Sequence, residues 1–389
     1  MHGLLVGVGI ERKDGSRDFK WLEKPIHNRI VSGGLDAYFQ FNGSNNTTSS
    51  SIAFVNRFLG YYSSDSSKKY GVLRYFAVGT NGSETGFNDT GLKAQVGGYS
   101  NSWTYTESPY IGFRRNDDDS ASIRLQSTSV SMPEAATIRE LGWFEKYDGV
   151  ETYVMFSRVV LDTPISLNAG DKLTACYQLN LTFSNMAETA VNPSLLTGLL
   201  DSDGNALRAT QKFNVLAYDN VTKGTWYNPG SIAVNFPAIA YYSRMGGNYP
   251  NASVNGWLFF APFYKSGVDA ASCLGYNTNA GFTKYSQWAR ANNQATTVFN
   301  TTGYNYDSYT VLDYVPGTYQ RDRKCVLAPT WPNQISGYQD VYAVCFGDLA
   351  MYFGYYDENN TWHAKPWRKE FGKRYEFTYR LKLSTEDTP

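Results

Sequence analysis

A regular alternation of apolar and polar residues over residues 172–183 is the feature that most constrains the fold of this chain. Every second residue from Leu173 to Phe183 is apolar, and the residues between them are Lys, Thr, Cys, Gln, Asn and Thr. Because successive side chains of a β-strand point to opposite faces, this period of two predicts a half-buried strand. We expect an antiparallel sheet with one face toward a core.

The same strand pattern occurs a second time near the C-terminal end. Residues 170–181 and 372–383 share the sequence Gly-x6-Tyr-x-Leu-x-Leu. Upstream of each copy lies a second match, Leu-Gly-Trp-Phe at 141–144 and Phe-Gly-Tyr-Tyr at 353–356, each followed by a polar turn. This order of matches predicts an internal duplication, in which each copy ends with a Tyr-x-Leu-x-Leu strand.

Turn signals extend the β prediction to the rest of the chain. Asp14-Gly15 and Asp203-Gly204 each separate two runs of strand-forming residues, which is typical of hairpins. The Asn- and Pro-containing stretch at 184–196 interrupts the strand pattern and is the expected linker. A length of 389 residues suits two domains with separate cores. We therefore predict an all-β chain of two tandem antiparallel β-sandwich domains, jelly-roll or immunoglobulin-like, at 1–187 and 188–389.

Composition narrows the classes of partner. The 35 basic and 35 acidic side chains give a formal net charge of zero, so a broad basic face for nucleic acid is not expected. No apolar run is long enough for a spanning helix or the core of a signal peptide, so no membrane partner is expected. Aromatic residues make up 16% of the chain, with 31 tyrosines, which suits pleated sheets and protein contact surfaces.

The cysteine and histidine positions give no sign of a metal or catalytic centre. The cysteines show no C-x-x-C pair, and we expect all four to be unbridged: Cys176, Cys273, Cys325 and Cys345. Cys176 falls on the polar side of its strand, and the matching position in the second copy is Thr378. His2, His27 and His363 are not at metal-ligand spacings from one another, which disfavours a zinc site or a histidine-dependent triad.

Other short motifs are better explained by local structure. The sequence DSDGN at 201–205 imitates the start of a calcium loop, but Lys212 stands where a bidentate Glu is needed, so a hairpin turn is expected. The acidic run at 117–119 is interpreted as a solvated loop. The glycines of GGLDAYFQF (33–41) and GVGI (7–10) are interpreted as turns and bulges. No catalytic, cofactor-binding or metal-binding residue is predicted.

Two aromatic stretches are candidate contact surfaces. SNSWTYTESPY (100–110) and NNTWHAKPW (359–367) combine Trp and Tyr with polar residues. If these rings are exposed, they could anchor a protein interface or stack on sugars, because both uses need large, rigid, amphipathic side chains. A pair of carboxylates could also make a glycosidase, and with 35 acidic residues the sequence leaves this open.

The first half of the chain resembles a modular β-rich segment of virion proteins of tailed bacteriophages. The similarity covers NRIVSGGLDAYFQF at 28–41, residues 75–97 and residues 136–183. The positions that carry it are Gly34-Leu35-Asp36, Gly79-Thr80, Asp89-Thr90-Gly91-Leu92, Glu140-Leu141-Gly142, Arg158-Val159-Val160 and the closing strand at 170–181. Gly91 and Trp143 depart from the usual Ala or Thr and the usual Leu.

This resemblance implies a structural component of the tail, baseplate, neck (collar) or fibre-attachment region, located in the virion after assembly in the host cytoplasm. It implies no catalytic residues and no cofactor, so no enzymatic activity is expected. The implied partners are other virion proteins and further copies of the chain in a symmetric assembly, with a host-surface glycan as an additional candidate. The alternatives are a glycan-binding adhesin, such as a receptor-binding fibre module, and a glycan hydrolase.

Overall fold

In the computed structural model, the chain is described at residues 1–40, 75–100, 112–116, 120–127, 129–146, 152–182, 189–213, 223–227, 306–311, 314–327, 329, 336–341, 343–346 and 349–388. The expected all-β fold is confirmed, since antiparallel sheets account for most of these residues. One α-helix and one 3₁₀ turn are the helical elements within these ranges.

An eleven-stranded antiparallel sheet contains the strands of the first half and one short strand from the second. Its order is β13-β5-β6-β10-β1-β2-β9-β8-β3-β4, with β7 paired to β10. The strands are β1 (His2–Glu11), β2 (Arg17–Ile30), β3 (Tyr75–Gly79), β4 (Gln95–Ser100), β5 (Gly112–Arg115), β6 (Ser120–Gln126), β7 (Val130–Ser131), β8 (Ala136–Lys146), β9 (Tyr153–Leu167), β10 (Lys172–Thr182) and β13 (Trp226–Tyr227).

The first hairpin forms where the Asp-Gly signal predicted it. β1 pairs with β2, and Gly15 has a φ of +86°, a left-handed conformation that glycine adopts without steric cost. The register shifts between Leu5 and Gly7, just before GVGI. Because of this shift, the base of the hairpin pairs differently from its tip. The expectation of a turn or bulge within GVGI is wrong, because its four residues pair in regular register with β2.

The expectation of turns and bulges in GGLDAYFQF is wrong, because this segment forms helix α1 (Ser32–Gln40). The glycines have a packing role here. A Cβ atom on Gly34 would lie 2.5 Å from the Cα atom of Phe156, so only glycine lets the helix lie directly on strand β9. The helix therefore lies against the sheet and presents Asp36 near the second half of the chain.

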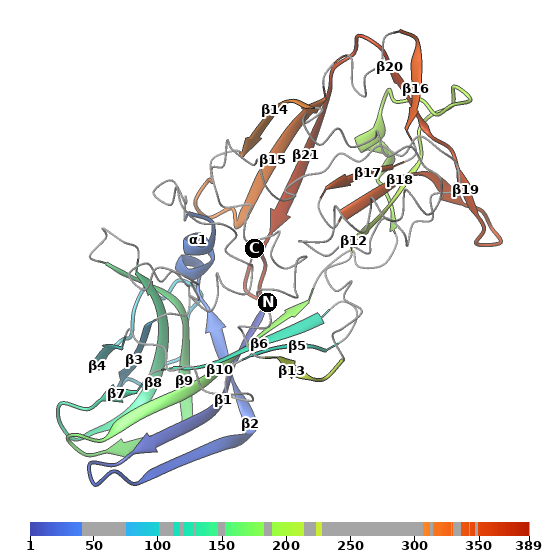
Figure 1. The fold of residues 1–389 in the computed structure, drawn as a ribbon. Coiled ribbons are helices and arrows are strands. Elements are labelled where there is room, and N and C mark those ends of the chain that lie inside the picture. The colour runs from blue at the N-terminus through green and yellow to red at the C-terminus, as the bar shows by residue number, and fades with distance from the viewer. Residues whose placement is uncertain are drawn as a thin grey trace.

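One hydrophobic cluster joins both ends of the large sheet. It contains Leu5, Ile123 and Tyr177 from the β1–β6–β10 part, and Val78 and Trp143 from the β3–β8–β9 part. Figure 1 shows these strands curving around a shared interior at the blue and green end of the molecule. Burial of these side chains supplies the main stabilisation of this region.

Strand β10 is more deeply buried than its alternation predicted. Residues from Ala175 to Leu179 are all buried, including Cys176 and Gln178 on the side interpreted as polar. The reason is that β10 lies between β1 and β6, and polar side chains of β6 cover its second face. Cys176 is a free thiol, as expected, and burial raises its pKa to about 12. The side chains of the other three cysteines lie outside the described residues.

The strands of the second half form three smaller sheets. The five-stranded sheet contains β11 (Thr189–Ala190), β12 (Ala209–Phe213), β17 (Ala343–Phe346), β18 (Leu349–Tyr356) and β19 (Trp362–Ala364). The three-stranded sheet contains β14 (Tyr306–Val311), β15 (Gln320–Leu327) and β21 (Tyr375–Lys382). The third sheet pairs β16 (Tyr338–Val341) with β20 (Trp367–Glu370), and the 3₁₀ turn η2 (Pro193–Leu196) precedes β12.

A second hydrophobic cluster lies between these sheets and centres on Trp367. Its indole is 1% exposed and packs 5.9 Å from Phe353 and 4.6 Å from Tyr375, measured between ring centroids. The expectation of an exposed aromatic ring at Trp367 is therefore wrong. The side chain of Trp362 and residues 101–110 lie outside the described residues.

The Asp203-Gly204 segment forms the expected hairpin turn. Leu200 bridges Ala206, and Asp201 Oδ1 accepts hydrogen bonds from the backbone nitrogens of Asp203 and Asn205. These bonds close the turn internally, as an Asx-type turn does. The acidic run at 117–119 lies outside the described residues.

The two halves of the chain meet at several points. In Figure 1 both chain ends lie between the blue-green and the orange-red strands, and the Met1 nitrogen donates to the carbonyl oxygen of Ser384 at 2.6 Å. Strand β13 extends the large sheet by pairing with β5. Tyr319 and Leu383, both 7% exposed, belong to the hydrophobic cluster of the first half. The core of the first half is therefore completed by residues from the second.

Candidate functional site

Asp89, Glu140 and Arg158, three of the positions named in the sequence analysis, meet in a buried ion network, although they are up to 69 residues apart in sequence. Arg158 on β9 places its Nε atom 2.7 Å from Glu140 Oε2 on β8, and its Nη1 atom 2.9 Å from Asp89 Oδ2. Arg158 and Glu140 are completely buried, and the Asp89 side chain is 8% exposed. A buried arginine paired with two carboxylates is a strong, geometrically specific interaction.

The network also fixes the backbone of the loop between β3 and β4. Arg158 donates to the carbonyl oxygens of Ser83 and Glu84 at 3.1 and 3.0 Å. Glu140 accepts hydrogen bonds from the backbone nitrogens of Lys93 and Ala94 at 3.1 and 2.8 Å. The loop is thus tied to β8 and β9 by side chains that are themselves anchored in the sheet.

The arrangement requires a glycine at position 79, at the end of β3. A Cβ atom at Gly79 would lie 2.5 Å from Glu140 Oε1 and 2.6 Å from the carbonyl oxygen of Ala94. Any larger residue would therefore push the Glu140 carboxylate out of the network. The Gly-Thr motif and the Glu-Leu-Gly motif are parts of one structural unit.

The negative charge of Asp89 is balanced by neighbouring cations and hydrogen-bond donors. Burial alone would raise the pKa of the Asp89 carboxyl, but hydrogen bonds from Lys93, the Gly86 nitrogen and Arg158, with the charge of Arg158, lower it below the ordinary value. Lys93 Nζ lies 2.7 Å from Asp89 Oδ1. Asp89 is therefore ionised near neutral pH and bonded to cations, an arrangement suited to holding structure.

A second contact point links the Gly-Leu-Asp motif to the second half of the chain. Asp36 on α1 accepts hydrogen bonds from the hydroxyl of Tyr314 and from the backbone nitrogen of Gly317, the latter at 2.8 Å. Burial and the Asp36 carboxylate raise the pKa of Tyr314, so its hydroxyl stays protonated and can donate. The loop that follows carries Tyr319 into the core of the first half.

A polar and aromatic cluster covers the outer face of β6 and β10. The Arg124 guanidinium lies 4.9 Å from the Trp21 ring centroid and 4.1 Å from that of Trp226, which is a cation–π arrangement. Arg124 also donates twice to Gln178 Oε1, at 3.2 and 2.7 Å, and Gln178 donates to Asn180 at 2.9 Å. Trp21 is 41% exposed, so the cluster reaches solvent on one side.

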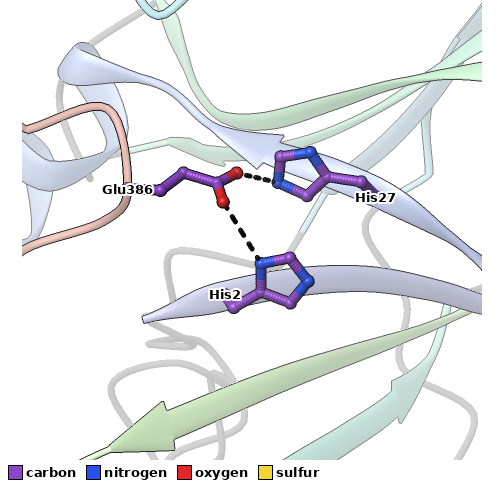
Figure 2. Close-up of side chains that lie close together, drawn as sticks. All are labelled: His2, His27 and Glu386. Carbon is purple, nitrogen blue, oxygen red and sulfur yellow. Dashed lines mark ion pairs between the residues drawn. The ribbon is translucent and has the colours of Figure 1, made fainter.

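The two N-terminal histidines meet a carboxylate from the C-terminal segment (Figure 2). His27 Nε2 lies 2.7 Å from Glu386 Oε1, and His2 Nδ1 lies 4.0 Å from Glu386 Oε2. The imidazole rings stack with centroids 4.7 Å apart and planes 4° from parallel. Burial lowers the pKa of His2, and the neighbouring His27 adds to this effect. We name these three side chains the His–Glu cluster.

Sequence spacing found some of these residues and missed others. The resemblance pointed to Asp36, Asp89, Glu140 and Arg158, and the structure gives each a specific bonding partner. The His–Glu cluster was missed. His2 and His27 are far apart along the chain, and the pairing of β1 with β2 brings them together. The third histidine, His363, is bonded at 2.8 Å to Asp357 and lies apart from the cluster in the second half.

Comparisons with protein-family models, with curated proteins and with solved structures give no match to this chain. None of the helices within the described residues is long and apolar enough to cross a membrane.

Proposed function

We propose that this protein is a structural component of a tailed-bacteriophage virion, in the tail, baseplate, collar or fibre-attachment region, where it docks neighbouring virion proteins. The observation that carries this proposal is the buried network of Asp89, Glu140 and Arg158. Three of the positions through which the sequence resembles phage virion proteins meet in it. Their role is to fix a loop on a sheet, which is an architectural role.

The bonding of the network also favours a structural reading over a hydrolase. A glycosidase needs two carboxylates that face a substrate, with one able to give up a proton. Asp89 and Glu140 instead face the same buried guanidinium and backbone donors, and the pKa of Asp89 is lowered. These two acids are therefore poor candidates for acid–base chemistry.

The proposal includes a duplicated β-sandwich. Gly170 and Gly372 both have positive φ, +84° and +81°, directly before the closing strands β10 and β21. Both closing strands contact a buried tryptophan, although not through matching positions. Tyr177 lies 4.9 Å from Trp143, and Tyr375, which matches Leu173 of the first copy, lies 4.6 Å from Trp367. Two modules of this kind would let one copy anchor to the particle while the other presents a surface. Several copies of the chain would then form a symmetric ring.

A glycan-binding adhesin is the second candidate, and the cluster around Arg124 favours it. Sugar-binding faces combine aromatic rings with amide and guanidinium donors, and Trp21, Gln178 and Asn180 offer these groups beside Arg124. In the described structure, however, Arg124 stacks on the two tryptophan rings itself. Binding of the parent chain to a glycan array, and its loss after Trp21→Ala, would support the adhesin over the structural component.

The experiment that tests the structural function is the composition of purified particles. Particles from a producing culture are separated on a density gradient, and the chain is quantified against the major capsid protein by mass spectrometry. We expect a fixed copy number in wild-type particles and loss of the chain in an Arg158→Met variant. Arg17→Met is the matched control, because Arg17 is 78% exposed and pairs only at the surface with Glu11. Particles of normal composition that lack the wild-type chain would contradict the proposal.

A further inference from the structure

The His–Glu cluster combines groups from three places in the chain that fold onto one spot. His2 comes from the start of β1, His27 from the end of β2, and Glu386 from the segment after β21 (Figure 2). The three ligand-type atoms all lie within 4.8 Å of one another. Side-chain exposures of 43%, 39% and 53% leave the cluster open to solvent and free to adjust.

The chemistry of these atoms selects a class of ion. Two imidazole nitrogens and one carboxylate oxygen are ligands that zinc and its first-row neighbours bind well, whereas calcium and magnesium prefer oxygen-only sites. Metal–ligand bonds of about 2.0–2.2 Å place ligand atoms roughly 3.3–3.6 Å apart in a tetrahedron. The present separations of 2.7 and 4.0 Å bracket that range, so small rotations of exposed side chains would suffice.

Other charged groups lie close to the cluster. The Met1 ammonium group interacts electrostatically with both His2 and Glu386, and it donates a hydrogen bond to the carbonyl oxygen of Ser384. The Nε atom of Arg29 is paired at 3.2 Å with Asp387. The carboxylate of Glu386 therefore faces the two imidazoles, with the Arg29 charge already compensated by the adjacent acid.

We propose that His2, His27 and Glu386 bind one divalent transition-metal ion of the zinc class, and that this ion fastens the C-terminal segment to the first hairpin. The segment already touches the first half through Leu383, which is buried in its core, and through the Arg29–Asp387 pair. A bound ion would add the strongest link to this set. It would make closure of the two halves depend on metal supply.

The test uses the full chain, purified without a polyhistidine tag and freed of metal with a chelator. Isothermal titration with zinc chloride measures affinity and stoichiometry at pH 7.5, and magnesium chloride serves as the oxygen-preferring comparison. We expect one zinc ion per chain and no heat of binding for magnesium. His2→Ala, His27→Ala and Glu386→Gln should each weaken zinc binding by about tenfold or more.

His363→Ala is the matched control, because His363 is similarly exposed and bonded to one carboxylate, Asp357, but lacks a second imidazole. It should leave zinc affinity unchanged. Limited proteolysis supplies a second readout: zinc should slow cleavage within residues 384–389 of the parent chain and have no such effect in His27→Ala. Equal zinc affinity in the parent and the three cluster variants, or equal loss in His363→Ala, would overturn the proposal.

Discussion

The guanidinium of Arg158 lies 2.7 Å from the carboxylate of Glu140, and both side chains are completely shielded from solvent. Each charge is stable in the interior because it is bonded to several partners, and the opposite charge of this pair is one of them. Burial of an isolated ion would cost far more than a protein of ordinary stability can tolerate. The stability of the first half should therefore depend on this pair.

Arg158→Met should destabilise the protein strongly, because it leaves Glu140 buried without its cation. Removing one partner of a buried ion pair typically costs about 3–5 kcal/mol. Equilibrium urea denaturation measures the change in the free energy of unfolding. The surface variant Arg17→Met should change it by less than about 1 kcal/mol. A change of similar size in both variants would mean that the network is not the support we describe.

Tyr319 should stabilise the first half although it belongs to the second. It is 7% exposed, lies in the first core cluster and has a φ of +52°, which is unfavourable for a residue with a side chain. Tyr319→Ala should cost roughly 3 kcal/mol through the lost ring. Tyr319→Gly should be less harmful by about 1 kcal/mol, because glycine relieves the backbone strain.

Hydrogen exchange of amides in β9 reports whether this loss reaches the first half. We expect faster exchange in Tyr319→Ala and no change in Tyr338→Ala, since Tyr338 is 62% exposed. Unchanged protection of β9 in Tyr319→Ala would show that the first half folds independently of the second.

Acid should weaken the protein through Asp89. The pKa of Asp89 in the folded state lies below the ordinary value of 3.8. Folding therefore favours the ionised form of this carboxyl group. This contribution is complete above the unfolded pKa and is lost as pH falls through 3.8 toward the folded pKa. The stability difference between the parent and Asp89→Asn should therefore shrink between about pH 5 and pH 3. A constant difference over this range would exclude Asp89 as the titrating group.

Lys369 should also make stability rise with pH, but in the alkaline range. Its side chain is buried, with Nζ 3.0 Å from the carbonyl oxygen of Pro329, and burial lowers its pKa from 10.5 to about 8. Above pH 8 the folded state loses this proton while the unfolded chain keeps it up to 10.5, so the unfolded state binds more protons and stability rises with pH. Comparison of urea denaturation of the parent and Lys369→Met at pH 7.5 and 9.5 tests this. The parent should gain relative to the variant, and parallel behaviour would contradict the assignment.

The strands and the first hairpin could be predicted from sequence because their signals are local. Alternation of side chains and an Asp-Gly turn depend only on neighbouring residues. Helix α1 was missed because its glycines resemble turn residues, whereas Gly34 serves the close approach to Phe156 on β9. That role depends on a strand more than a hundred residues away, and no local pattern contains it.

The His–Glu cluster could not be predicted for a related reason. In β1 the single residue Val6 lies between the paired positions Leu5 and Gly7, whereas four residues of β2, 22–25, lie opposite it. The two strands therefore differ by three residues at this point. Because three is an odd number, side chains of β2 beyond the shift point to the opposite face from the one that the register at the hairpin tip would give, and His27 lies on the same face as His2. The third member, Glu386, arrives through the tertiary fold of the C-terminal segment.

A density map of the intact particle is the most direct test of the structural function. The account predicts density in the tail, baseplate, collar or fibre-attachment region into which the eleven-stranded sheet with helix α1 fits, repeated around a symmetry axis. Complete assignment of all virion density to other chains, together with recovery of this protein only from the soluble fraction of the lysate, would contradict it.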